Sequence, residues 1–426
     1  MLVEKKKDKI KILTISDMPL VLSGVALQTK YLIEGLLKTG KYQFLSLGAA
    51  IRHEKYNPLR IQEYGDEWVV LPIDGYGNTQ MMREILDTEK PDAIWFITDP
   101  RFFTWLFEMV DEISDRGIPL MWWTIWDNLP TPTFNKFFYN SCDFLGCISK
   151  LTYNIMKDLG LEHKAEYIPH AVPSGTYKIL DEKFVQEEKI KLFGETKKDT
   201  FMIFYCSRNA RRKKTSDLVA AFKQFSDQIG DKEGEKCFLV MNTDPNDPEG
   251  GDLLQVAQML QLKPSQITFS KERIEFDKLA LLYNMADVTS CCAAEEGFGL
   301  SSLESLMCGT PVVSTKTGGL QDQNIDPDTG EVFGVSIEPI SKLLVGSQQI
   351  PWIYSDHPSH QQMVDAFTQM YNMTKQDRDE LGKLAHDSVI KRFDMDQMIS
   401  KWDAAIMKCV DGFKNGNPRR IRVRSF

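Results

Sequence analysis

The sequence lacks the features that would place it in a membrane or in an oxidising compartment. Nowhere do eighteen uncharged apolar residues follow one another, so no segment is predicted to span a bilayer. The first apolar run, in KIKILTIS, stops before Asp17 and Pro19, too soon for a signal-peptide core, and is predicted to be a strand. The eight cysteines include no Cys-x-x-Cys pair and lie mostly in apolar segments, which favours buried free thiols. We expect a cytoplasmic protein.

Excess positive charge is also absent. The formal net charge is -9 with 26% charged residues, so the composition implies no global attraction to nucleic acid or anionic lipid. Any such attraction must come from two local clusters, which as charged chain ends are also commonly solvated. These are Lys5, Lys6, Lys7 and Lys9 at one end and Arg419, Arg420, Arg422 and Arg424 at the other.

Two runs of alternating apolar and amphipathic segments fill most of the 426 residues, and there is no internal repeat. Many of the strands are apolar throughout, as in parallel sheets covered on both faces. We predict an α/β protein with two Rossmann-like, doubly wound parallel-sheet domains, which face each other across a ligand cleft lined by the carboxyl ends of strands. The predicted domains are residues 1–172 and 173–395, followed by a helix and basic tail over 396–426 that packs back on the first domain. The strands are expected at 9–16, 42–49, 68–74, 92–98, 119–127, 143–149 and 165–172, and then at 201–207, 237–243, 287–293 and 310–315.

The stretch EEGFG, residues 295–299, joins the predicted strand 287–293 to the predicted helix 299–309. A strand, a glycine turn and a helix N-terminus bring free backbone N–H groups and the positive end of a helix dipole to one place, which suits a phosphate. Gly297 and Gly299 allow a ligand to approach the backbone closely. Glu304 lies about two turns into the helix, where it can reach a sugar ring, while Glu296 lies on the turn itself. A plain turn with two surface glutamates is the structural alternative.

The pattern Glu296-Gly-Phe-Gly-Leu-x3-Glu304, followed by CGTPVVSTKTGG, resembles the donor-site signature of family 4 glycosyltransferases, which are retaining enzymes of the GT-B fold. The resemblance extends to NMADVTSCCAAEE, to SRNARRKKTSDLVAAF, to YIPHAV and more weakly to LSGVALQTKYLIEGL. It implies the transfer of a sugar from a nucleoside-diphosphate sugar to an acceptor hydroxyl, with retention at the anomeric carbon.

The resemblance also implies roles for individual residues. Glu296 would lie beside the donor sugar near its anomeric carbon, and Glu304 would bind the nucleotide ribose. Arg208 and Lys213 would bind the diphosphate, with Lys214 as a competitor for the lysine role. Cations fixed against a leaving group that gains negative charge stabilise the transition state, so we expect neither a metal nor a cofactor beyond the nucleotide sugar. The backbone amides of the turn that would contact the sugar and diphosphate belong to Gly297, Phe298, Gly299 and Leu300.

Further donor-side positions follow from strand ends and from the resemblance. Gly24, with Ser23 before it, opens the helix after the first strand, and Asn242 follows the strand CFLVM. Arg273 and Ile274, in KERIEF, lie where relatives hold the base, for which uracil is our first expectation.

At TIWDNLP relatives carry a histidine that contacts the donor sugar, whereas this chain has Trp126 and Asp127. A narrower pocket would suit a sugar without the hydroxymethyl group, such as a pentose. Trp126 is otherwise a core residue, with Asp127 making the polar contacts to the sugar. His170 either contacts the ligand or is a hydrogen-bonded structural histidine at the hinge.

The acceptor is left open by the sequence, as is the oligomeric state. Residues 334–360 replace a short connection of the family and, with GGLQDQ, look similar to bacteriophage-encoded members that glycosylate hydroxymethylated bases in DNA. The acceptor would then be a DNA base and the location the host cytoplasm; a lipid or a glycan is the other possibility. A nucleotide-sugar-binding paralogue without transfer activity is the alternative from another class.

Overall fold

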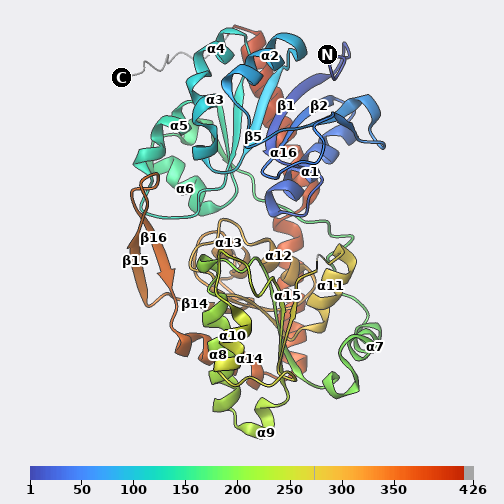
Figure 1. The fold of residues 1–426 in the computed structure, drawn as a ribbon, viewed down its shortest axis with the longest axis vertical. Helices are drawn as coiled ribbons and strands as arrows, with labels where there is room; N and C mark the ends of the chain where they lie inside the picture. Colours follow the sequence, from blue (N-terminus) through green and yellow to red (C-terminus); the bar gives the residue numbers. More distant parts are fainter. Residues whose placement is uncertain (273, 417–426) are drawn as a thin grey trace. The chain divides into compact units, whose positions relative to one another are not determined.

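The computed structural model describes residues 1–272 and 274–416, which form two compact units (Figure 1). The first unit comprises Met1–Ala171 and the chain from Met395 onward, and the second comprises Val172–Asp394. The sequence-based prediction placed the divisions after residues 172 and 395. The predicted contacts of Arg273 and the basic tail with Arg419, Arg420, Arg422 and Arg424 lie outside the described residues.

The first unit is built on an eight-stranded sheet in the order β3-β4-β2-β1-β5-β6-β7-β8. Its ladders are parallel except for β3 with β4. The central strands are buried along nearly their whole length because helices cover both faces. The strands are β1 (Ile10–Asp17), β2 (Tyr42–Ala49), β3 (Leu59–Arg60), β4 (Trp68–Pro72), β5 (Ala93–Ile97), β6 (Leu120–Thr124), β7 (Phe144–Cys147) and β8 (Ala165–Tyr167).

The helices of the first unit follow the predicted alternation with one difference. Residues 104–115, whose pattern is that of one amphipathic helix, are divided into α3 (Thr104–Glu108) and α4 (Val110–Asp115), because the backbone of Met109 leaves the helical region. The remaining helices are α1 (Gly24–Lys38), α2 (Thr79–Glu89), α5 (Lys136–Asn140), α6 (Lys150–Asp158) and α16 (Met395–Lys414).

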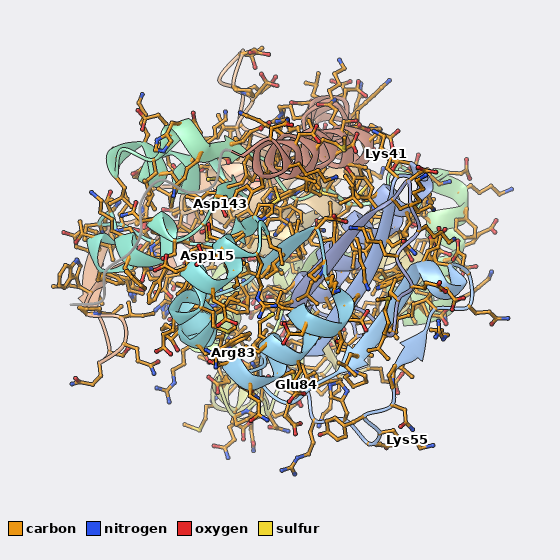
Figure 2. All side chains as sticks on the ribbon, turned by 90° about the horizontal axis from the view of Figure 1, so that it is seen from above. Lys41, Lys55, Arg83, Glu84, Asp115 and Asp143 are labelled. Carbon is orange, nitrogen blue, oxygen red and sulfur yellow. The ribbon has the colours of Figure 1, made fainter. Side chains whose placement is uncertain are left out.

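Helix α16 returns from the end of the second unit and completes the core of the first (Figure 1). Trp402 is fully buried, and its ring meets those of Trp95 and Trp123 edge to face at 5.8 and 5.5 Å. A Cβ atom added to Gly146 would lie 2.6 Å from the Trp402 ring, so only glycine fits beneath it. Lys41, labelled in Figure 2, forms an ion pair with Asp403 of this helix at 2.6 Å.

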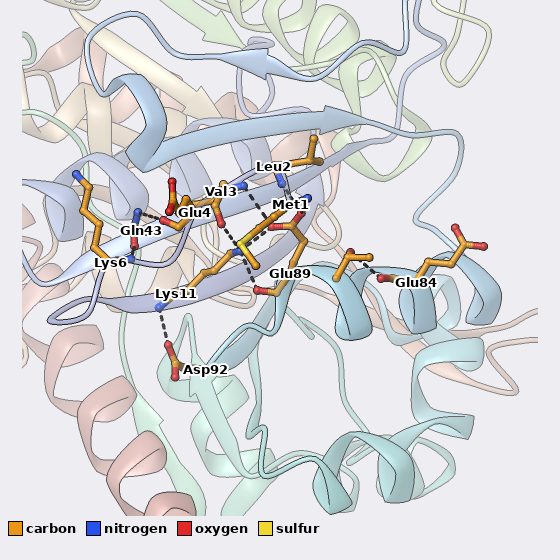
Figure 3. Close-up of polar contacts among 11 residues, drawn as sticks. Met1, Leu2, Val3, Glu4, Lys6, Lys11, Gln43, Glu84, Glu89 and Asp92 are labelled. Carbon is orange, nitrogen blue, oxygen red and sulfur yellow. Dashed lines mark hydrogen bonds and ion pairs between the residues drawn. The ribbon is translucent and has the colours of Figure 1, made fainter.

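A buried ion pair fastens the segment before β1 to the end of α2 (Figure 3). The Lys11 side chain has no exposed surface, and its Nζ donates to Glu89 Oε2 at 2.6 Å, to the Glu89 carbonyl at 2.8 Å and to the Val3 carbonyl at 2.5 Å. The Glu89 carboxylate also accepts the backbone N–H groups of Leu2 and Val3. Burial would raise the pKa of Glu89, but the hydrogen bonds from Lys11 and these amides hold it below its ordinary value.

The second unit contains a six-stranded parallel sheet in the order β11-β10-β9-β12-β13-β14. Its strands are β9 (Phe201–Cys206), β10 (Cys237–Asn242), β11 (Ile267–Ser270), β12 (Val288–Cys291), β13 (Val312–Thr315) and β14 (Gly334–Ile337). Its helices are α7 (Glu182–Phe193), α8 (Thr215–Gln228), α9 (Asp231–Gly234), α10 (Leu253–Met259), α11 (Phe276–Met285), α12 (Leu300–Met307), α13 (Leu320–Asn324), α14 (His360–Asn372) and α15 (Lys375–Arg392). Buried apolar side chains of α8 and α14 pack on β9 and β10 as one core.

The inserted residues 334–360 contain an antiparallel hairpin, β15 (Ser341–Val345) with β16 (Ile353–His357). The base of this hairpin is hydrogen-bonded to the loop after β12, since the Asp356 N–H donates to the Ala294 carbonyl at 3.1 Å. In the part of the chain that the structure describes, no helix has both the length and the apolar character needed to cross a lipid bilayer.

Candidate active site

The loop Cys292–Gly299, between β12 and α12, packs against a second glycine turn. The Gly319 N–H donates to the Glu296 carbonyl at 3.1 Å, and Gln323 Nε2 donates to the Phe298 carbonyl at 2.6 Å. A Cβ atom on Gly319 would lie 2.5 Å from the Gly297 carbonyl oxygen. The backbone of the first turn is therefore fixed by the second.

Gly299 makes the transition from this loop into α12. Its φ of +89° is a left-handed conformation that side chains rarely adopt, and an added Cβ would meet Leu320 at 2.5 Å. Gly299 occupies the N-cap position of α12 and, as a glycine, has no side chain that could accept a hydrogen bond from the first N–H groups of the helix. The first backbone N–H groups of α12, beginning at Leu300, are thus oriented out of the helix as donors, which suits an oxyanion.

Two predicted residues, Glu296 and Lys213, are brought together at this loop. Their side chains form an ion pair and are 17% and 10% exposed. Burial would raise the pKa of Glu296, but Lys213 and Arg212 hold it below its ordinary value. Glu296 is therefore an anion at neutral pH, next to the uncapped start of α12.

Arg208 is placed differently from Lys213. Its side chain is 63% exposed and forms a two-pronged ion pair with Asp247, at 2.7 Å from Nε and 3.1 Å from Nη2. The neighbouring Arg212, which is not among the predicted site residues, donates from Nη1 to the Glu295 carbonyl at 2.8 Å. Spacing within RNARRKK could not distinguish these arginines, because η6 (Arg211–Lys213) is a short 3-10 turn that no periodicity reveals.

Lys214 lies beside the inserted hairpin. Its Nζ is 3.0 Å from His357 Nδ1, on β16. Burial and the positive charge of Lys214 both lower the pKa of His357, so the imidazole is neutral and accepts this hydrogen bond.

The side chain of Glu304 is hydrogen-bonded by tyrosines. The hydroxyl of Tyr283, on α11, donates to Glu304 Oε2 at 2.8 Å. Burial raises the pKa of Glu304 to about 7, although hydrogen bonds from Tyr283 and Tyr177 act in the opposite direction. Glu304 is therefore divided between its protonated and ionised forms near neutral pH. No motif in the sequence pointed to either tyrosine.

The remaining donor-side predictions lie at strand ends or in irregular chain. Asn242 ends β10, and its Nδ2 is 3.4 Å from Sγ of Cys206, at the end of the paired β9. Ile274 is half-buried in the loop before α11. Nothing in these contacts assigns either residue to a base or a ribose.

Ser23 and Gly24 lie where the sequence placed them, at the N-terminus of α1 after β1. Ser23 Oγ accepts the Ala26 N–H at 3.1 Å and donates to Asp17 Oδ2 at 2.9 Å. The other oxygen of Asp17 accepts from the hydroxyl of Tyr76 at 2.7 Å.

An aromatic pair extends this cluster. The ring of Phe102, which is 49% exposed, stacks on Tyr76 with ring centroids 4.8 Å apart. Thr98, between β5 and Phe102, has a φ of +94°, a strained conformation for a β-branched residue. Because β1 and β5 are neighbours at the point where the strand order reverses, these groups lie at the usual ligand-binding edge of a doubly wound sheet. Sequence patterns did not reveal Asp17, Tyr76 and Phe102 as a group, because these residues come from three segments far apart in the chain.

Trp126, Asp127 and His170 also belong to the first unit. Trp126 is 7% exposed, and its indole N–H donates to the Asn128 carbonyl at 2.9 Å, so its single donor is used within the loop. Asp127 beside it is half-buried. His170 is 6% exposed and meets Trp123 edge to face at 4.4 Å; burial lowers its pKa to about 3, so it is neutral at physiological pH.

The lysine cluster at residues 5–9 is largely neutralised by acids. Lys5 pairs with Asp92 at 2.6 Å, and Lys6 and Lys9 pair with Glu67 at 2.5 and 2.6 Å. Among the described residues no group of three or more His, Cys, Asp or Glu side chains is arranged to hold a metal ion.

Residues 186–344 match the model of the family "Glycosyl transferases group 1". The matched residues lie within the second unit and include the loop at 292–299 and Glu304. The N-acetyl-alpha-D-glucosaminyl L-malate synthase of Bacillus anthracis is 23% identical over 244 residues, 56% of this chain and 55% of that protein. The D-inositol 3-phosphate glycosyltransferase of Corynebacterium jeikeium is 48% identical over 44 residues, 10% of each chain. The chain thus spans about half the length of the first relative and less of the second.

Solved structures resemble the whole chain. The sucrose-phosphate synthase of Thermosynechococcus elongatus superimposes with a TM-score of 0.71 at 15% identity, covering 96% of this chain and 99% of that one. Anabaena HepE in complex with UDP and glucose gives a TM-score of 0.68 at 13% identity, covering 94% and 100%. These neighbours confirm the predicted GT-B type of α/β fold with two Rossmann-like parallel sheets.

Proposed function

We propose that the protein is a retaining, metal-independent glycosyltransferase that moves a sugar from a UDP-sugar to an acceptor hydroxyl. The observation that carries this proposal is the Lys213–Glu296 ion pair beside the uncapped N-terminus of α12. One helix start, one cation and one ionised carboxylate at a glycine turn provide places for a diphosphate and for a sugar. We propose UDP as the nucleotide, which is supported by HepE, similar over 94% of this chain and solved in complex with UDP and glucose.

The diphosphate would occupy the N–H groups at the start of α12, with its charge balanced by Lys213. Arg208 reaches the ligand only if its ion pair with Asp247 opens, whereas Arg212 is already hydrogen-bonded to the loop. Because the leaving diphosphate gains negative charge as the glycosidic bond breaks, these fixed donors stabilise the transition state more than the bound substrate. This charge balance requires no metal ion.

The chemistry breaks the bond between the anomeric carbon and the diphosphate oxygen and forms a bond from the acceptor oxygen on the same face. The departing diphosphate takes the acceptor's proton, so the anomeric configuration is retained. Glu296, held as an anion by Lys213, orients the donor sugar through its hydroxyl groups. Glu304 binds the ribose by accepting hydrogen bonds from its hydroxyl groups. The ionised carboxylate can accept with both oxygens, whereas the protonated form carries an O–H donor on one of them.

The donor sugar stays a prediction. The pentose hypothesis rested on Trp126 replacing a histidine, and the indole N–H of Trp126 is already donated to Asn128. A panel that includes UDP-glucose and UDP-xylose decides between a hexose and a pentose.

For the acceptor, the cluster at the switch point of the first unit favours a hydroxylated molecule of the glycan type. The Asp17 carboxylate is an acceptor-only group, so a ligand that binds to it would donate O–H or N–H. The exposed Phe102 ring offers a flat apolar face beside it. Asp17 and the ion-paired lysines provide no basic surface for a duplex, whose affinity depends on phosphate neutralisation. A hydroxymethylated DNA base and a lipid are the competing acceptors in the test.

The test is a transfer assay read by mass spectrometry, in which UDP-, GDP- and ADP-sugars are offered with mono- and disaccharides, hydroxymethylcytosine DNA and lipid vesicles. We expect turnover with a UDP-sugar and a retained anomeric configuration by NMR. Glu296→Gln should reduce turnover at least tenfold, while the neighbouring Glu295→Gln serves as the matched control and should retain it. An inverted product contradicts the mechanism, and donor binding without any turnover identifies a nucleotide-sugar-binding paralogue.

A further inference from the structure

The second unit contains a hollow of about 700 Å³ at the edge of its sheet opposite the 292–299 loop. Its wall includes Thr200, Asp287 and Pro311, which precede β9, β12 and β13, together with α7 and the first turn of α15. The 292–299 loop follows the carboxyl end of β12, so the two features lie at opposite ends of the same parallel strands. The volume is in the range of small-molecule binding sites.

A buried ammonium group faces this hollow. Lys189 lines it, is 3% exposed, and donates from Nζ to the Thr200 carbonyl at 3.2 Å. Among the described residues no carboxylate forms an ion pair with it, and burial lowers its pKa while Asp287 and Asp199 act in the opposite direction. An ammonium has three donors, so this single hydrogen bond leaves two of them to be satisfied. Burying an ammonium group with unpaired N–H groups raises the free energy of the folded state unless a hydrogen-bond acceptor is supplied.

The acids of the wall are engaged elsewhere. Asp287 accepts from the Met202 N–H at 2.8 Å and from Arg378 at 2.7 Å. Glu233 accepts from Lys236 at 2.9 and 3.0 Å, and from the hydroxyl of Tyr371 at 3.0 Å. The remaining acids of the wall are exposed, and two of them, Glu182 and Asp379, share Lys375. The group that still needs a partner is therefore a cation.

A second polar atom faces the same space from the same helix. Gln186 lies three residues before Lys189 on α7, so both side chains project from one face of that helix. Its Oε1 is buried and has no hydrogen-bond partner among the described residues. The hollow is thus lined by the Lys189 ammonium, which has two further N–H groups to donate, and, one helical turn away, by Gln186 Oε1, which accepts no hydrogen bond from the described residues.

We propose that this hollow is a binding site for a small oxyanion that carries a hydroxyl group, such as hydrogen phosphate or a hydroxycarboxylate. The anionic oxygens accept the two remaining N–H groups of Lys189, and the hydroxyl donates to Gln186 Oε1. The site is separate from the proposed donor site and does not depend on the proposed function.

One helix connects the two sites. Cys308, Gly309 and Thr310 line the hollow and directly follow α12, whose first residue adjoins Gly299 of the glycine turn. A ligand in the hollow therefore contacts one end of the helix that carries Glu304. The site is placed to influence donor binding, although its occupancy is tested without reference to activity.

The experiment compares matched pairs of anions on the full-length protein. Melting temperatures are measured at constant ionic strength with phosphate against sulfate, and with glycolate against acetate, since only the first of each pair carries a hydroxyl at pH 7. We expect phosphate and glycolate to raise the melting temperature by about 3 °C or more above sulfate and acetate at saturation. Lys189→Met should abolish this difference, and Gln186→Leu should reduce phosphate to the level of sulfate.

The controls separate this site from others that bind anions. Lys236→Met, which alters an exposed lysine of the same wall, and Lys213→Met, at the donor site, should both keep the difference. Hydrogen exchange should show that phosphate protects α7 and residues 308–310. The proposal is overturned if none of the hydroxylated anions gives a shift, if Lys189→Met and Gln186→Leu both keep it, or if protection appears at residues 296–300 instead.

Discussion

The raised pKa of Glu304 makes UDP binding depend on pH in a specific direction. With a pKa of about 7, the carboxylate is roughly one-tenth ionised at pH 6 and nine-tenths ionised at pH 8. If the ionised form binds the ribose, the association constant for UDP should rise about tenfold between pH 6 and pH 8. Binding near pH 7 should also release about half a proton, because ribose hydroxyls stabilise the ionised form.

Tyr283→Phe tests the physical cause of this behaviour. The mutation removes the hydrogen bond that Tyr283 donates to Glu304 Oε2 at 2.8 Å. A hydrogen bond to a charged group contributes about 1.5–3 kcal/mol, so its loss should move the midpoint of the pH dependence up by about one unit or more. Isothermal titration of UDP from pH 5.5 to 8.5, in buffers of different ionisation enthalpy, measures the affinity and the protons released. Tyr371→Phe, whose hydroxyl contacts Glu233 instead, is the matched control.

The raised pKa of Glu304 also determines how the stability of the folded protein changes with pH. The folded state binds the Glu304 proton more tightly than the unfolded chain, so the stabilisation is fully present below pH 4.5 and is lost as the pH rises through about 7. The shift from 4.5 to about 7 corresponds to about 3 kcal/mol, an upper value because part of the side chain is solvated. UDP affinity that is constant with pH, or a midpoint unmoved by Tyr283→Phe, would refute this reasoning.

Three further predictions concern the fold. Lys11→Met should lower the free energy of unfolding by about 3–5 kcal/mol because it leaves Glu89 buried without its cation, whereas the double variant with Glu89→Leu should recover most of the loss in urea denaturation. Gly299→Ala should cost more than about 1 kcal/mol and weaken UDP binding, since its φ of +89° and the contact with Leu320 both exclude a Cβ. Gly146→Ala should lower the melting temperature by several degrees through its clash with Trp402, and a wild-type melting temperature would show that α16 does not pack there.

Much of the fold could be predicted from the sequence because its strands are apolar on both faces. Periodicity found the central strands of both sheets. The division of the helix at Met109 could not be predicted, because Thr104–Asp115 reads as one amphipathic segment and only tertiary packing interrupts it.

Local sequence motifs could predict the candidate-site residues that lie close together in the chain. Glu296, Gly299 and Glu304 lie within nine residues of one another, so one motif contains them, and Lys213 precedes a helix whose pattern is clear. Tyr283 and the Asp17–Tyr76 contact join segments 21 and 59 residues apart, and no spacing rule connects them. Whether Arg208 reaches the diphosphate stays a prediction, since its side chain is paired with Asp247.

The dissociation constant of UDP for Lys213→Met tests most directly whether a diphosphate binds at the glycine turn. Lys213 is a cation fixed beside that turn by its ion pair with Glu296, and a charge-assisted hydrogen bond contributes about 1.5–3 kcal/mol. We expect UDP to bind Lys213→Met about 10- to 150-fold more weakly than wild type. UDP should bind normally to the control Lys223→Met, whose lysine pairs with Asp227 on α8. Equal affinity of the wild type and Lys213→Met for UDP would contradict this prediction.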